Sequence, residues 1–335
     1  MLTDFKGEVW ANALPEVLEE INIANNTLNE YGYGEDSYSE RVSQLLQKEF
    51  TKQIKCIFTV NGTAANIIAL KSMLDRFSSV ICTSQTHINT YEAGAFEYTL
   101  GNKILTCNSE NAKITPTLIE QTIEKNKVYD FIPKVVVLSQ PTELGTVYTN
   151  NELKEICNYA HKNNMFVYLD GARISMAIDN QKTTLKEMLQ DTGIDVFSFG
   201  GTKVGAMFGE IIIYLNQDFA KNLNYLTKQS MLHFPKSKFL ACQFYALLKN
   251  DLWKRSGKIA NDMAKKLEMT LKQKGYKIAY PCESNCVFVY MDENTLNKIK
   301  QIYTIDYWYK QEKIIRFATS YNTTEEQINN LKKYL

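Results

Sequence analysis

The stretch that decides the fold is VVVLSQPTELGTVYTNNELKEICNYAHKNNMFVYLD, residues 135–170. It begins with an apolar run, continues through an amphipathic pattern over 151–162, and ends with a second apolar run over 166–169. Uniformly apolar strands on either side of a helix are typical of a parallel β-α-β unit whose sheet is covered on both faces. Thr149 or Asn150 is the expected cap of this helix.

The same alternation extends outward on both sides. Further strand candidates lie at 55–60, 80–82, 103–105, 196–199 and 210–215, and further helical patterns at 64–77 and 115–126. After about residue 216 the pattern changes to long helical segments at 238–253 and 259–275, then strand candidates at 286–291 and 314–318 and a final helix at 324–334. We therefore predict an α/β protein whose large domain, 15–245, has a mostly parallel sheet covered by helices. Residues 246–335, with an N-terminal arm over 1–14, are expected to form a smaller α/β domain.

Composition and charge exclude several kinds of partner. The 38 Lys and Arg residues against 37 Asp and Glu residues leave a formal charge of +1, which argues against a nucleic-acid or anionic-membrane partner. We find no membrane-length apolar stretch and no signal peptide. The seven scattered cysteines suggest reduced thiols in a cytoplasmic protein, and the three widely separated histidines suggest no zinc site.

Polar groups follow the carboxyl ends of the predicted strands, where an open α/β sheet binds its ligands. Asp170 directly follows one strand, and Lys203 lies in a glycine-rich turn after the next. Gly62 and Thr63 open a helix, where backbone N–H groups and a hydroxyl can bind a phosphate. His87 follows another strand.

Each of these residues also has a simpler structural interpretation. Asp170 could cap a turn, Lys203 could be a solvated loop lysine, and Gly62-Thr63 could be an ordinary strand–helix turn. His87 could be a polar residue satisfied at a strand end. Together, however, a phosphate cradle, an acid, a lysine and an aromatic ring fit one cofactor, pyridoxal 5'-phosphate.

Seven segments carry a resemblance to a known family. They are GYGEDSYSE (32–40), NGTAAN (61–66), THINTYEAGAFE (86–97), SQPTELGTVYT (139–149), LDGAR (169–173), FSFGGTKVGAMFGE (197–210) and RFATSYNTTEEQI (316–328). In this order they resemble the threonine aldolase and β-eliminating lyase family of pyridoxal-phosphate enzymes, which have the aspartate-aminotransferase-type fold.

The resemblance implies a role for each matching residue at the ring. Lys203 would hold the cofactor as a Schiff base, and Asp170 would keep the pyridine nitrogen protonated. Arg173 would reach the ring hydroxyl or hold the cofactor, and Gln140 would touch the ring. His87 would stack on the ring and help to move the proton of the substrate hydroxyl.

The remaining implied roles concern the phosphate and the substrate. Gly62, Thr63 and Thr202 would contact the phosphate, and Arg316 would form a two-point pair with the substrate carboxylate. The family is oligomeric with shared sites. Tyr33 and Lys238 would therefore reach the site of a neighbouring subunit, in a homodimer or homotetramer.

The activity implied is retro-aldol cleavage of a threonine-like β-hydroxy-α-amino acid to glycine and an aldehyde. Two departures from the family's pattern bear on the substrate. Gly7 stands where a hydroxyl side chain is usual, and Thr142 stands near the place of a second histidine. A related reaction (β-elimination, racemisation or transaldol transfer) is the alternative, and a non-catalytic cofactor-binding protein is a third.

Overall fold

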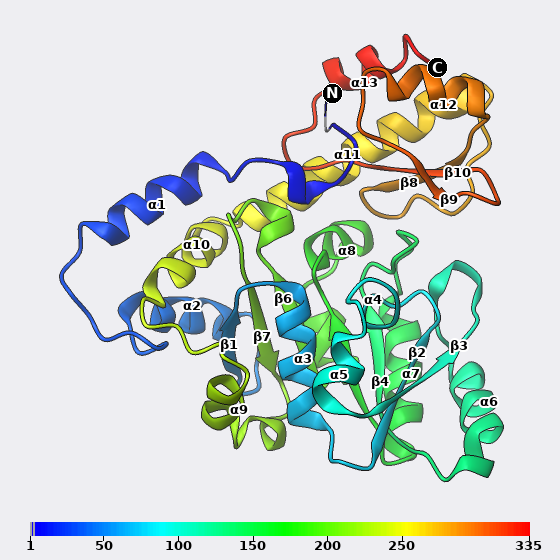
Figure 1. Ribbon diagram of the computed structural model, residues 1–335. Coiled ribbons are helices and arrows are strands. Elements are labelled where there is room, and N and C mark those ends of the chain that lie inside the picture. The colour runs from blue at the N-terminus through cyan, green and yellow to red at the C-terminus, as the bar shows by residue number, and fades with distance from the viewer. Residues whose placement is uncertain (1, 3) are drawn as a thin grey trace.

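A computed structural model of the chain describes residue 2 and residues 4–335, with the backbone alone at residue 129. Its larger part is built on a seven-stranded sheet in the order β1-β7-β6-β5-β4-β2-β3 (Figure 1). The strands are β1 Lys55–Thr59, β2 Ser78–Thr83, β3 Lys103–Cys107, β4 Ile132–Ser139, β5 Phe166–Asp170, β6 Val196–Gly200 and β7 Glu210–Tyr214. The five strands from β3 to β6 run parallel, and β7 is antiparallel to both of its neighbours. The predicted α/β fold with a mostly parallel sheet is confirmed.

Helices cover both faces of this sheet because its strands are apolar on both sides. Along β4, Val135 and Val137 enter one core, and Val136 and Leu138 enter the other. The first core packs under α3 Gly62–Met73, α5 Ala95–Leu100 and α9 Leu223–Gln229. The second packs under α1 Pro15–Asn25, α2 Ser37–Lys48, α6 Pro116–Asn126, α7 Asn150–Lys162, α8 Ile174–Gln181 and α10 Lys238–Lys249.

Helix α7 begins as its sequence indicated. Thr149 is the N-cap, its hydroxyl accepts from the backbone of Glu152, and the Glu152 carboxylate accepts from the backbone of Thr149. This reciprocal capping box satisfies two backbone donors that the helix cannot satisfy itself. The expectation of Thr149 as one of two possible caps is confirmed.

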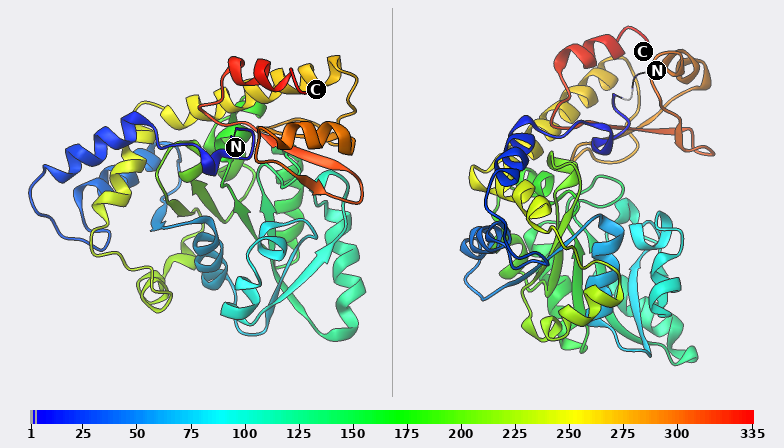
Figure 2. Two further views of the ribbon diagram at one scale, coloured as in Figure 1. Left: turned by 45° about the horizontal axis from the view of Figure 1, so that its top comes forward. Right: turned by 60° about the vertical axis from the view of Figure 1, so that its left-hand side comes forward.

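A second, three-stranded antiparallel sheet forms the smaller part of the molecule (Figure 2). Its order is β8-β10-β9, with β8 Cys286–Tyr290, β9 Tyr307–Tyr309 and β10 Ile314–Ala318. Helices α11 Leu252–Gln273, α12 Glu293–Lys300 and α13 Glu325–Leu331 pack on it. Phe5 from the N-terminal arm is buried in the same core.

Helix α11 joins the two parts. Its first half, with Leu252 and Trp253, is buried in the core of the large sheet, and its second half, with Leu267 and Leu271, is buried in the core of the small sheet. The domain boundary between 245 and 246 stays a prediction. No helix in the described part of the chain is both long and apolar enough to span a bilayer.

Candidate active site

The carboxyl ends of the parallel strands bring the sequence-predicted residues to one edge of the large sheet. Asp170 ends β5, and Lys203 lies in the short 3-10 helix Thr202–Val204 after β6. His87 begins α4 (His87–Thr90) after β2, and Gly62 begins α3 after β1. The small sheet lies beyond this edge (Figure 1), and a cavity lined by Arg173, residues 6–10 of the N-terminal arm and Arg316 forms the cleft between the two parts.

A chain of buried hydrogen bonds fixes Asp170 and His87 relative to each other. Asn66 Nδ2 donates to Asp170 Oδ2 at 3.2 Å and to Glu92 Oε1 at 2.6 Å. The Tyr168 hydroxyl donates to Asn66 Oδ1 at 2.8 Å. Glu92 Oε1 also lies 2.7 Å from His87 Nδ1. Since Glu92 holds Nδ1, the imidazole is oriented with Nε2 as its free nitrogen.

Lys203 lies among charged groups in a buried turn. Its pKa is lowered by burial and by the positive charge of Arg173, against the raising effect of nearby carboxylates. Those carboxylates belong to Glu8, Asp170 and Glu210. A lowered pKa provides the neutral amine that a lysine needs to attack a carbonyl carbon.

Glu210 is the least expected of these carboxylates. It begins β7, is 3% exposed, and its Oε2 has no hydrogen-bond partner among the described residues. Burial raises its pKa to about 8, and Asp170 acts in the same direction, while the charge of Lys203 lowers it. Lys203 and Glu210 are therefore a buried pair whose protonation states depend on each other.

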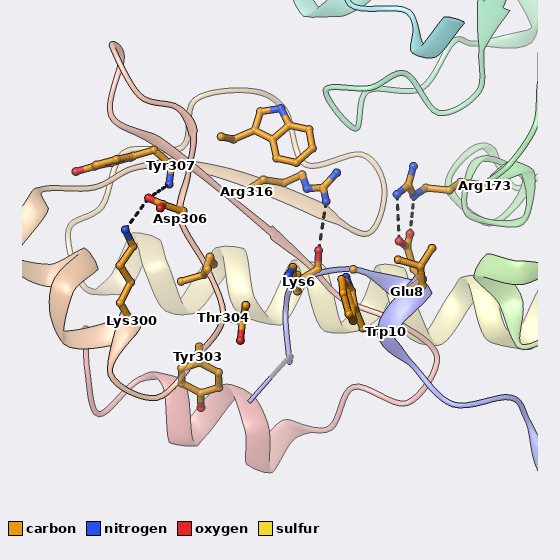
Figure 3. A pocket seen from close by; sticks show the side chains of 14 residues that line it. Lys6, Glu8, Trp10, Arg173, Lys300, Tyr303, Thr304, Asp306, Tyr307 and Arg316 are labelled. Carbon is orange, nitrogen blue, oxygen red and sulfur yellow. Dashed lines mark hydrogen bonds and ion pairs between the residues drawn. The ribbon is translucent and has the colours of Figure 1, made fainter. Parts of the chain in front are cut away.

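Arg173 is bound by the N-terminal arm. Its Nε and Nη2 donate to the two carboxylate oxygens of Glu8, at 2.5 Å and 3.1 Å (Figure 3). Asn285 also donates to Glu8. Burial alone would raise the pKa of Glu8, but the charge and hydrogen bonds of Arg173 lower it to about 2. Two nitrogens of Arg173 are thus engaged within the chain, and its predicted contact with the cofactor stays a prediction.

Arg316 lies on the opposite side of the cleft, on β10. Its guanidinium stacks over the Trp308 ring, 3.8 Å from the centroid, and Nη2 donates to the Lys6 carbonyl at 3.2 Å. Its Nε is buried with no partner in the described part of the chain. Figure 3 shows Arg316 above the arm residues Lys6 and Trp10, in a cavity of about 590 Å³. A buried, unpaired guanidinium N–H calls for an anionic partner such as a carboxylate.

The comparisons with known proteins agree with this geometry. A family model described as beta-eliminating lyase matches residues 11–294. The chain belongs to the beta-eliminating lyase family.

Relatives within that family extend over nearly the whole chain. The low specificity L-threonine aldolase of Pseudomonas sp. is 33% identical, covering 98% of this chain and 95% of its own length. A solved structure of Leishmania major threonine aldolase superposes with a TM-score of 0.92 at 28% identity, over 99% of this chain and 98% of that one. A Thermus thermophilus aspartate aminotransferase superposes with a TM-score of 0.72 at 14% identity, which shows the shared fold.

For this member of the beta-eliminating lyase family, the residues present fit pyridoxal phosphate. The Lys203 amine and the Asp170 carboxylate lie at neighbouring strand ends, one suited to an aldehyde and the other to a pyridinium nitrogen. At the start of α3, a side chain added to Gly62 would meet nothing within 4 Å, so the helix N-terminus is open to an anion. The Thr202 hydroxyl accepts from Gly209 N at 3.1 Å and lies beside Lys203.

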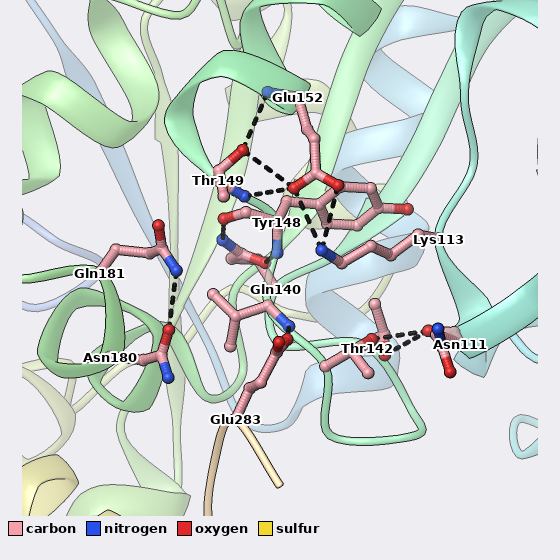
Figure 4. A network of polar contacts seen from close by, with 12 residues as sticks. Asn111, Lys113, Gln140, Thr142, Tyr148, Thr149, Glu152, Asn180, Gln181 and Glu283 are labelled. Atoms are coloured by element: carbon pink, nitrogen blue, oxygen red, sulfur yellow. Dashed lines mark hydrogen bonds and ion pairs between the residues drawn. The ribbon is translucent and has the colours of Figure 1, made fainter. Parts of the chain in front are cut away.

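The Gln140 side chain does not lie among the residues around Lys203 and Asp170. Its side-chain amide donates to the Tyr148 carbonyl at 2.9 Å and accepts from the Tyr148 N–H at 3.0 Å (Figure 4). Neighbouring residues of a strand face opposite sides of the sheet, so Gln140, one position beyond Ser139, faces away from the side of Asp170. The Gln140 amide is thus engaged by the Tyr148 backbone, and its predicted ring contact stays a prediction.

Within the single chain, Tyr33 and Lys238 also lie apart from the residues around Lys203 and Asp170. The Tyr33 ring stacks on His233 at 4.3 Å and is 55% exposed. Lys238, at the start of α10, donates to Thr27 Oγ1 at 3.2 Å. Both positions suit the neighbouring-subunit role implied by the sequence, which stays a prediction.

Several residues of the site were not assigned from the sequence. They are Glu8, Asn66, Glu92, Glu143 and Glu210. A usable signal existed for Asn66, because it is a polar side chain inside the apolar helix 62–73 and a buried amide needs partners. For Glu8 there was none, since its partner Arg173 is 165 residues away. Within the described residues, no group of three or more His, Cys, Asp or Glu could hold a metal ion.

Proposed function

We propose that this chain is a pyridoxal-phosphate-dependent aldehyde-lyase that cleaves threonine-like β-hydroxy-α-amino acids to glycine and an aldehyde. One arrangement carries this function. Lys203 and Asp170 lie at the ends of neighbouring strands of the large sheet, and Arg316 lies on the small sheet across the cleft. The names of the Pseudomonas and Leishmania major relatives support the same reaction.

The position of each residue supports one proposed role. Lys203 would hold the cofactor covalently through Nζ, and the Asp170 carboxylate would keep the pyridine nitrogen protonated. Gly62, Thr63 and Thr202 would hold the phosphate, and Arg316 would hold the substrate carboxylate. When bound, pyridoxal phosphate supplies an electron sink for the bond that is broken at Cα.

Orientation would decide which bond at Cα breaks. Arg316 would hold the substrate carboxylate from the small sheet, and the cofactor, bound at the edge of the large sheet, would hold the substrate amine in place of Lys203. With both ends held, the Cα–Cβ bond can be kept perpendicular to the cofactor ring, which is worth a large part of a barrier. The His87 ring, held by Glu92, would stack against the cofactor.

We also propose a homo-oligomer, a homodimer or homotetramer, in which Tyr33 and Lys238 of one subunit complete the site of the next. The exposure of Tyr33 supports this arrangement. A cytoplasmic location is proposed because all seven cysteines are free thiols, as is usual in a reducing compartment.

Product analysis tests the proposed reaction. The protein loaded with pyridoxal phosphate is incubated with threonine, and glycine, acetaldehyde, 2-oxobutanoate and ammonia are measured. We expect glycine and acetaldehyde in equal amounts, and no products from the Lys203→Ala variant. Formation of 2-oxobutanoate and ammonia would assign the chain to β-elimination, and no product from any β-hydroxy-α-amino acid would contradict an enzymatic role.

A further inference from the structure

Glu143 lies between β4 and α4 and has no part in the proposed roles. It lies in the loop after β4, and its Oε1 accepts a hydrogen bond from the Ser139 hydroxyl at 2.6 Å. The same oxygen accepts from the His87 N–H at 2.8 Å. Glu143 is therefore fixed both to the strand that ends beside Asp170 and to the first residue of α4.

The surroundings of this carboxylate link it to residues of both sheets. A series of rings crosses the cleft, with His87 and Tyr91 at 5.4 Å and Tyr91 and Trp308 at 5.6 Å, ending at Arg316 on Trp308. The charge of Glu143 raises the pKa of Tyr91, after the larger effect of burial, so the two side chains are near each other. A substrate held by Arg316 at its carboxylate and by the cofactor at its amine would place its β-carbon in the region between Asp170 and Arg316, on the side of these rings.

The nearest alternative, Thr142, is already engaged elsewhere. Its hydroxyl shares a hydrogen bond with the Thr146 hydroxyl at 2.7 Å and donates to the Asn111 carbonyl at 3.4 Å. Figure 4 shows Thr142 beside Asn111. Thr142 is 4% exposed and its hydroxyl is engaged in these two contacts, so it is not available to a substrate hydroxyl.

We propose that the Glu143 carboxylate takes the proton of the substrate β-hydroxyl as the Cα–Cβ bond breaks. This inference rests on the proposed aldol cleavage. The O–H electron pair becomes the second C–O bond of the aldehyde, and the electron pair of the broken bond stays on Cα. Cα then takes up a proton to give glycine, and Glu143 returns its proton to solvent, so no other reactant is needed.

The electrostatics of the site suit this role. Burial raises the pKa of Glu143, the charge of Asp170 acts in the same direction, and the hydrogen bond from Ser139 lowers it. A carboxylate with a raised pKa is a better base near neutral pH than an exposed one. The titratable groups whose charges interact with it are Cys82, Tyr91, Tyr148, Asp170 and Tyr309, and His87 contacts it through its backbone N–H.

The Glu143→Gln variant separates a proton-transfer role from a structural one. A glutamine oxygen can still accept from Ser139 and from the His87 N–H, but it cannot take a proton. Two reactions of the cofactor-loaded protein are compared: threonine cleavage, and exchange of the α-proton of glycine with D₂O followed by NMR. Exchange needs the cofactor and Lys203 but involves no β-hydroxyl.

We expect kcat for cleavage to fall on the order of 10²- to 10⁴-fold in Glu143→Gln, with KM and glycine exchange changed by less than about threefold. Glu152→Gln, which alters a carboxylate of the α7 cap outside the cleft, is the matched control and should keep both rates. Wild-type cleavage rates in Glu143→Gln would overturn the inference, and so would an equal loss of cleavage and exchange. Absence of glycine release by the wild-type protein would instead overturn the proposed function itself.

Ser139→Ala provides an independent test. Loss of the hydroxyl removes a hydrogen bond that lowers the pKa of Glu143, so this pKa should rise further. Because the base acts in its ionised form, the acid limb of the kcat profile for cleavage should move to higher pH, and the profile for glycine exchange should not. An acid limb that stays in place would overturn the role of Glu143.

Discussion

The Glu8 carboxylate receives two hydrogen bonds from the Arg173 guanidinium, at 2.5 Å and 3.1 Å, and the pair joins the N-terminal arm to the start of α8. Glu8 is 1% exposed. The N-terminal arm is therefore held beside the floor of the active site by a buried ion pair. This ion pair should stabilise the folded protein.

Glu8→Gln should lower the free energy of unfolding at neutral pH by about 3 kcal/mol, because the partly buried Arg173 is left without its counter-charge. Urea denaturation measures this change. Glu16→Gln is the control: Glu16 pairs with Arg255 at 2.7 Å on the surface, and its loss should cost less than about 1 kcal/mol. Equal losses in the two variants would show that the Glu8 pair is not special.

The same pair predicts a pH dependence of stability. The pKa of Glu8 is lowered from its ordinary value of 4.5 to about 2 in the folded protein. The stabilisation is therefore fully present above pH 4.5 and is lost as the pH falls toward 2. Between these values the wild-type protein should lose more stability than Glu8→Gln, and parallel curves for the two proteins would contradict the assignment.

Asp170→Asn should keep the fold and lose the reaction. An asparagine can still accept from the Ala172 N–H, which lies 2.9 Å from Asp170 Oδ1, so the turn should form. Without the negative charge the pyridine nitrogen loses its counter-ion, and kcat/KM for threonine should fall on the order of 10²-fold or more in excess cofactor. Asp179→Asn, a similar change in α8, is the control. Activity of Asp170→Asn within threefold of the wild type would exclude the proposed pairing.

Arg316→Lys should affect substrate binding more than turnover. A lysine supplies the charge but not the planar two-point contact with a carboxylate, so KM for threonine should rise about 10- to 100-fold. Steady-state kinetics gives KM and kcat separately. Arg255→Lys, on the surface, should change neither. An unchanged KM in Arg316→Lys would mean that the carboxylate is held elsewhere.

Complementation tests whether sites are shared between subunits. Lys203→Ala should be inactive because it lacks the cofactor anchor in its own subunit. Tyr33→Ala should be inactive because it leaves the site of the neighbouring subunit incomplete. If Tyr33 completes the site of a neighbour, a dimer mixed from the two variants contains one intact site. Co-refolding equal amounts should then recover about a quarter of wild-type activity. Failure to recover any activity, with mixed oligomers confirmed by differently tagged chains, would place Tyr33 outside the neighbouring site.

The sequence by itself determined the large sheet and the groups at its strand ends. Asp170, Lys203 and His87 could be found because each lies at the end of an apolar strand or a few residues after it, and parallel strands end at one edge. The cap at Thr149 was local in the same sense, since its partner Glu152 is three residues away. Information of this kind is carried within a few residues of the chain.

Tertiary structure alone decided which side chains meet. Glu8 and Arg173 are 165 residues apart, and Asn66 and Asp170 are 104 apart, so no local pattern could pair them. Gln140 shows the same limit, because strand register turned its side chain away from Asp170. Glu143 could not be assigned from the sequence for the same reason. The backbone after β4 places its carboxylate against the His87 N–H, a contact that sequence spacing does not encode.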